Sequence, residues 1–193
     1  MSISDSSIRF HNDSIRKRRA PLDSPVELYT SQLARVSIPA DVADPEAKVT
    51  IAPLCDPELH GHIFKDVAID PRRIGRAYRY AYGNCVVGGR PSNVLNGTCR
   101  VDLADGSVLT WSDAPNAIPA GPPTFVPRLG ADPDIETDGV LLVDCLGGDG
   151  RAFFAVLDGA TFREIGRVTL PYRHCISVFN MWVWDAAVTL KAQ

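Results

Sequence analysis

Two histidines separated by one residue, His60 and His62, are the first side chains of this sequence that could carry metal chemistry. On a β-strand, residues i and i+2 lie on one face, so both imidazoles could point toward one metal ion. No third ligand stands nearby in the sequence. We therefore interpret them as two surface histidines. His11 lies near the N-terminus, beside Phe10, with no partner evident from the sequence.

Thiols are the second group of side chains that could carry chemistry. The chain has five cysteines, an odd number, and no Cys-x-x-Cys pair: Cys55, Cys85, Cys99, Cys145 and Cys175. Cys99 and Cys145 fall inside strand-like apolar runs, where a thiol behaves as a small hydrophobic side chain. We expect a reduced, intracellular protein and no zinc site.

The basic run Arg16–Arg19 could serve as a nuclear or nucleic-acid-binding patch. Residues 1–30 show no periodicity, so we interpret this run as a solvated part of a loose N-terminal segment. The formal net charge of -3 favours neither nucleic-acid nor membrane-surface binding. No apolar run approaches the about 20 residues of a transmembrane segment. The polar N-terminus indicates no secretory signal, and both cytoplasm and plastid remain open as locations.

The elements that would position these residues are β-strands. Residues 140–146, 153–157 and 165–170 form apolar or alternating runs separated by clusters of Gly, Asp and Pro. This pattern is typical of antiparallel strands joined by hairpins. Further strands are predicted over residues 32–38, 48–52, 93–103 and 107–111. Residues 70–83 place Arg76, Tyr78, Tyr80 and Tyr82 at alternate positions, which predicts a strand with one aromatic face.

No helical pattern of three turns occurs in the chain, so we predict an all-β protein. Strands at intervals of roughly ten residues indicate either a sandwich or the blades of a propeller. A four-stranded blade takes about 40 to 50 residues, so residues 31–193 would hold three or four blades. We assign residues 1–30 to the loose segment and residues 31–193 to this β domain.

Three long stretches, in order over residues 64–172, resemble the C-terminal part of the carotenoid cleavage oxygenases. They read DPRRIGRAYRYAYG, NVLNGTCRVDLADGSVLTW, and PAGPPTFVPRLGA followed by ETDGVLLVDCL and DGRAFFAVLDGATFREIGRVTLP. The resemblance implies part of a seven-bladed β-propeller, about its last three blades, with few helices. It also implies Fe(II), held by four histidines and used with O2 to split a conjugated double bond of a carotenoid or apocarotenoid. A subset of the family isomerises retinyl esters. In the family, glutamates orient three of those histidines by accepting their second ring N–H.

The residues at the family's metal positions differ in this chain. The last iron-binding histidine would fall on Phe179, or on Asn180 if one residue is inserted, and His174 lies five or six residues too early. A glutamate of the family's PGEPxFVPR segment corresponds to Pro122. The glutamate of its EFPxI segment corresponds to Lys65, with Asp66 one residue away.

The third histidine motif has no match, and the two motifs before it in the family are absent. We therefore expect no catalytic or cofactor-binding residue in this chain, and no retained iron.

Two functions follow from these differences. The chain is either an inactive fragment of a carotenoid-cleaving dioxygenase or a non-catalytic module that binds an apolar ligand or a partner chain. An unrelated sandwich is the third interpretation. Missing blades would leave open sheet edges, which favours self-association.

Overall fold

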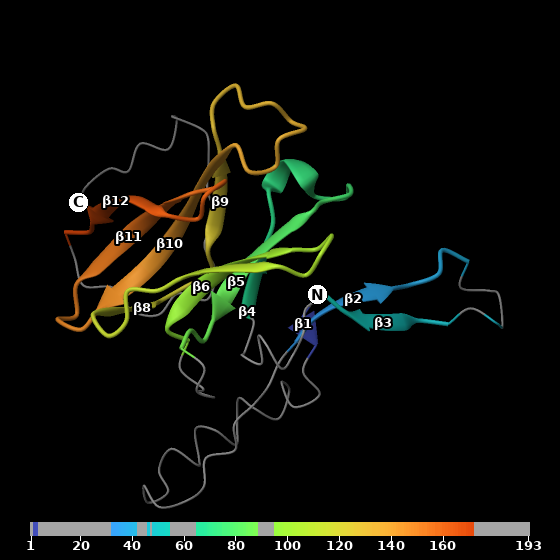
Figure 1. The fold of residues 1–193 in the computed structure, drawn as a ribbon, viewed down its shortest axis with the longest axis horizontal. Coiled ribbons are helices and arrows are strands. Elements are labelled where there is room, and N and C mark those ends of the chain that lie inside the picture. Colours follow the sequence, from blue (N-terminus) through green and yellow to red (C-terminus); the bar gives the residue numbers. More distant parts are fainter. Residues whose placement is uncertain are drawn as a thin grey trace, which may run out of the picture.

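The fold is taken from a computed structural model that describes residues 2–3, 32–41, 46, 48–54, 65–88 and 95–171. The described strands form three antiparallel sheets, which Figure 1 shows from right to left in sequence order. The only helical element among the described residues is the 3-10 helix η1, Pro71–Arg73. The prediction of an all-β fold is confirmed. No helix in this described part is long and apolar enough to cross a membrane.

The first sheet has the strand order β1-β2-β3, formed by Ser2–Ile3, Gln32–Ser37 and Thr50–Pro53. Strands β2 and β3 form a hairpin that projects from the rest of the molecule (Figure 1). The pairing of Ser2 with Leu33 joins β1 to this hairpin. Residues 4–31 lie outside the described part, so the boundary assigned at residue 31 stays a prediction.

The second sheet, β4-β5-β6-β7, comprises Lys65–Ala68, Tyr80–Cys85, Gly97–Asp102 and Val108–Trp111. The strand predicted over residues 70–83 begins only at Tyr80. Its first part forms η1 instead, because Pro71 lacks an N–H for a sheet ladder and the Asp70 carboxylate accepts a hydrogen bond from the Arg72 N–H at 2.9 Å. Tyr78 therefore precedes the strand and is exposed, whereas Tyr82 is fully buried.

The third sheet has the order β12-β11-β10-β8, with β9 also paired to β10. Its strands are Ala117–Pro119, Thr124–Pro127, Gly139–Gly147, Ala152–Asp158 and Glu164–Thr169. Strands β10 and β11 pair continuously from Val140 opposite Asp158 to Leu146 opposite Ala152. The predicted succession of hairpins is thus confirmed for this part of the chain.

The second sheet lies between the other two, and both faces of β5 are therefore buried. Ala81 packs with Leu33 of β2 in one cluster, while Tyr82 points the other way into the core of the third sheet. The Tyr82 ring stacks on Phe125 at 5.3 Å between centroids and on Phe162 at 6.5 Å. Successive sheets packed face to face are the arrangement of neighbouring propeller blades.

Arginines connect the second sheet to the third. The Arg100 guanidinium donates to the carbonyl oxygens of Gly159 and Ala160, at 2.5 and 2.9 Å. Arg72 donates to carbonyl oxygens in the turn that follows β9, including that of Asp132 at 3.3 Å. Each guanidinium has several donors in a fixed plane, so one side chain can satisfy several carbonyls. These contacts hold the loops that the apolar core does not reach.

We expect Tyr82 to stabilise the fold through its ring and not through its hydroxyl, which is buried with no hydrogen-bond partner among the described residues. Tyr82→Ala should lower the free energy of unfolding by about 3–5 kcal/mol because a large buried ring is lost. Tyr82→Phe should raise it by up to about 1 kcal/mol, because an unpaired buried hydroxyl is removed. Urea denaturation measures both. A clear loss of stability in Tyr82→Phe would show that the hydroxyl has a partner.

Candidate functional site

The positions singled out in the sequence fall into two groups. All four histidines, His11, His60, His62 and His174, lie outside the described residues, as do Phe179 and Asn180. The assignments made for them stay predictions. The other two positions are in the described part. Lys65 is the first residue of β4, and Pro122 lies half-buried between β8 and β9.

Asn84 brings the segments of Lys65 and Pro122 together. It lies on β5, is 2% exposed, and is paired in register with Lys65 of β4. Its Nδ2 donates to the carbonyl oxygen of Gly121, the residue before Pro122, at 2.8 Å. Lys65 and Pro122, the two positions predicted to correspond to glutamates, therefore both adjoin one buried amide.

Two further side chains complete this cluster. Asn84 Nδ2 also donates to Asp66 Oδ2 at 3.2 Å, and Asn84 Oδ1 accepts from Thr98 Oγ1 at 3.0 Å. Thr98 lies on β6 and is fully buried. We name the four residues Asp66, Asn84, Thr98 and Gly121 the Asn84 junction, since it joins three strands of the second sheet to a loop of the third.

Backbone features on each side position the residues of the junction. The register of β4 against β5 shifts between Lys65 and Ala68, and Asp66 there has a φ of 59°. Asp is among the residues that tolerate this left-handed conformation, since its short polar side chain can bond locally. On the other side, the N–H of Ala120 donates to the carbonyl oxygen of Asp144 at 2.7 Å, which fixes the loop beside Gly121.

The junction connects structural elements and does not form a metal site. The Asn84 amide has two N–H donors, and contacts within the protein engage its nitrogen twice and its oxygen once. The only carboxylate is Asp66, and proline at 122 offers none. Across the described ranges, no group of three or more His, Cys, Asp or Glu side chains could hold a metal ion. The described residues of the junction therefore do not fit a ferrous ion.

Burial also removes two nearby groups as acid–base or nucleophilic candidates. Desolvation raises the pKa of the Cys145 thiol to about 12, so the thiol stays protonated at neutral pH. Desolvation likewise raises the pKa of the Tyr82 hydroxyl. Cys85, Cys99 and Cys145 are buried and reduced, which confirms the interpretation of Cys99 and Cys145 as small hydrophobic side chains.

Asn84 and Thr98 were not singled out from the sequence. A signal was present in the stretch YAYGNCVV, because asparagine is depleted in strands and this one stands in an otherwise apolar or small-residue run. Buried polar side chains are nearly always hydrogen-bonded, so such an asparagine predicts partners without identifying them.

Comparison with known proteins matches most of the chain to one family. The profile described as retinal pigment epithelial membrane protein matches residues 3–184. Carotenoid cleavage dioxygenase 8 homolog B, chloroplastic, from Oryza sativa is 38% identical over 128 residues, which cover 66% of this chain and 21% of that protein. Torulene dioxygenase from Fusarium fujikuroi is 35% identical over 107 residues, covering 54% of this chain and 17% of that protein.

Solved structures give the same result for the fold. A mutant of Synechocystis apocarotenoid oxygenase superimposes on this chain with a TM-score of 0.69 at 25% identity. The match covers 80% of this chain and 30% of that one. The chain thus spans less than a third of the length of the relatives it matches here.

Loss of the Asn84 side chain should destabilise the protein. We expect Asn84→Ala to lower the free energy of unfolding by about 2 kcal/mol, because it leaves the Thr98 hydroxyl and the Gly121 carbonyl buried without this partner. The matched control is Asn116→Ala, since Asn116 is exposed and its side chain donates one long bond, 3.3 Å, to Asp113. Equal effects of the two substitutions in urea denaturation would contradict a structural role for the junction.

Proposed function

The chain belongs to the carotenoid oxygenase family, and from that premise we propose that it forms part of the propeller of an enzyme that cleaves a carotenoid or apocarotenoid. In such an enzyme, Fe(II) and O2 would split a conjugated double bond of the polyene. The observation that carries the proposal is the arrangement of the three sheets, which superimposes on an apocarotenoid oxygenase with a TM-score of 0.69. The relatives named above include dioxygenases whose names specify carotenoids and torulene.

We further propose that this chain does not hold the iron by itself. The support comes from residue types. Lys65 and Pro122 replace two carboxylates that would orient imidazoles, and the last histidine position holds Phe179 or Asn180. Loss of one such carboxylate typically weakens metal affinity about 10- to 100-fold. The described residues would then act as a scaffold, positioning the polyene-binding face without supplying metal ligands.

The alternative is a non-catalytic module that binds an apolar ligand or a partner chain. The observation that favours it is the exposed apolar surface of the β2–β3 hairpin, where Ile38 is 70%, Val49 58% and Ile51 59% exposed. Such side chains gathered on one projecting element are typical of an interaction surface. Location in the plastid or the cytoplasm is open under both proposals; the rice relative is named chloroplastic.

Self-association through open sheet edges is part of the proposal. Strand β3 is at the end of its sheet, all four of its residues are exposed, and none of them is charged. Natural proteins usually protect such an edge with charge, proline or a covering segment. Among the described residues, Pro53 gives such protection at one end of β3.

A graft tests the scaffold proposal. Residues 65–171 should replace the matching segment of the Synechocystis apocarotenoid oxygenase, with Lys65→Glu and Pro122→Glu restored. We expect this chimera to fold, retain iron and cleave an apocarotenal, because the sheets superimpose and the carboxylates are returned. The chimera carrying Lys65 and Pro122 should bind iron about 10- to 100-fold more weakly. A folded but inactive restored chimera would contradict the scaffold role.

The isolated chain is the control for the iron proposal. After purification with Fe(II) under nitrogen, it should contain far less than one iron per chain by elemental analysis. One tightly bound ferrous ion per chain would contradict the proposal.

Light scattering tests the proposal of open edges. We expect the purified chain to be oligomeric, and Ile51→Lys to shift it toward monomer, because a charge on an edge strand opposes edge pairing. The control is Leu129→Lys, because Leu129 follows β9, lies outside any strand and is 88% exposed. A parent chain that is already monomeric would contradict self-association, and an equal response to both substitutions would exclude β3 as its site.

A further inference from the structure

A groove of about 600 Å³ lies where the β2–β3 hairpin meets the second sheet. Its volume is within the usual range for small-molecule sites. It is separate from the Asn84 junction, none of whose residues lines it. Most of its lining is apolar and includes Leu33, Leu54, Val67 and Tyr78, together with Arg35 and Arg76.

The charge of the groove has one sign. Arg35 and Arg76 contribute two guanidinium groups, and none of the described residues that line the groove carries a carboxylate. Both arginines are exposed. Other arginines are engaged differently, since Arg79 pairs with Asp102 at 2.7 Å and Arg128 with Asp138 at 2.7 Å. Two exposed positive charges border an apolar surface here.

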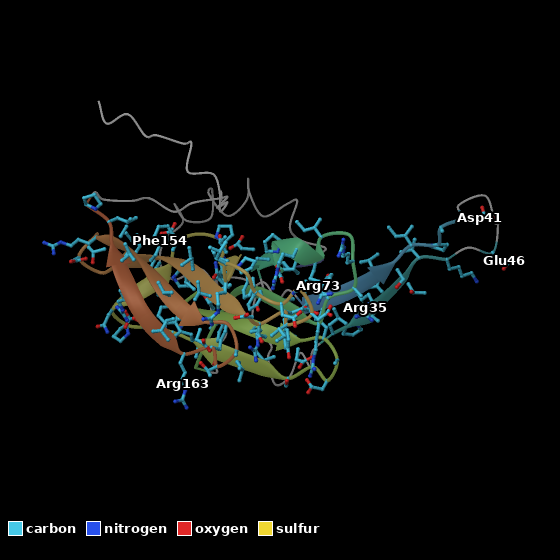
Figure 2. The ribbon with its side chains drawn as sticks, turned by 90° about the horizontal axis from the view of Figure 1, so that it is seen from above. Arg35, Asp41, Glu46, Arg73, Phe154 and Arg163 are labelled. Carbon is cyan, nitrogen blue, oxygen red and sulfur yellow. The ribbon has the colours of Figure 1, made fainter. Side chains whose placement is uncertain are left out.

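The apolar wall of the groove is accessible. Val67 on β4 is 37% exposed and Tyr78 is 39% exposed. A valine is more often buried, so this exposure leaves apolar surface open to a ligand. Leu33 and Leu54 form the deeper part, where they pack on the second sheet. Figure 2 shows Arg35 at the end of the hairpin nearest the body, with Asp41 and Glu46 at its far tip.

We propose that this groove binds a free long-chain carboxylate, with the alkyl chain along the apolar wall and the carboxylate at Arg35 and Arg76. Guanidinium groups bind carboxylates through charge-assisted hydrogen bonds, which a neutral chain of the same length cannot form. A second copy of the protein seated by its β3 edge is a poorer fit, because that edge carries no negative charge to meet the two arginines. The proposal does not depend on the iron chemistry proposed above.

Isothermal titration of the full chain with dodecanoate tests the proposal, with dodecanol and dodecyltrimethylammonium as matched ligands. We expect saturable binding of dodecanoate, at least about tenfold tighter than either matched ligand. Raising the salt concentration should weaken dodecanoate binding alone, because ions screen exposed charges. Octanoate should bind much more weakly, since each methylene removed costs roughly fourfold in affinity.

Variants distinguish the groove from other surfaces. The double substitution Arg35→Met and Arg76→Met keeps an unbranched apolar stem and removes both guanidinium groups. It should weaken dodecanoate binding at least about tenfold while leaving dodecanol binding unchanged. The control is Arg163→Met, since Arg163 is exposed at a turn away from the groove (Figure 2). Val67→Asp places a carboxylate in the groove and should also reduce dodecanoate binding.

Three results would overturn the proposal. The first is equal affinity for dodecanoate and dodecanol, which would indicate an apolar site without charge selection. The second is unchanged dodecanoate binding in both the arginine double variant and Val67→Asp, with thermal melting confirming that they are folded. The third is the absence of saturable dodecanoate binding by the parent chain.

Discussion

The structure depends on one constraint, which is that strand β5 is covered on both faces. All of its residues after Tyr80 are buried, with Ala81 directed to the hairpin side and Tyr82 to the third sheet. A strand in this position has no solvent-facing side on which a polar group could be hydrated. Any polar side chain on β5 must therefore find its partners inside the protein, because an unpaired buried group is costly.

Asn84 is the polar side chain that this constraint governs. Its partners come from β4, β6 and the loop after β8, so satisfying one amide also fixes three segments relative to β5. Lys65 and Pro122, the positions predicted to correspond to two glutamates of the family, adjoin this amide. In this chain, an amide that binds neighbouring segments occupies the region, next to a lysine and a proline. The hydrogen bonds of Asn84 therefore serve to connect neighbouring segments of the protein.

Arginines have a similar structural role outside the core. Arg72, Arg79 and Arg100 contact carbonyl oxygens or carboxylates of other segments, and Arg79 holds the pKa of the Asp102 carboxyl below its ordinary value through a hydrogen bond. In the second and third sheets, internal hydrogen bonds and ion pairs engage these guanidinium groups. Arg35 and Arg76 instead line a groove whose described residues carry no carboxylate, and there we propose that they bind a ligand.

The sequence by itself determined the all-β class, the hairpins of the third sheet, the burial of Cys99 and Cys145, and the family. These follow from alternation, turn residues and ordered motifs, which are local properties of the chain. It did not locate the start of β5, because the Asp70 cap and Pro71 override an alternation that continues through Tyr78. Only the tertiary structure decided that Asp66, Asn84 and Gly121 meet, and that Arg35 and Arg76 border one groove. Contacts between residues 18 or 37 positions apart leave no periodic signal, so they arise only when sheets pack together.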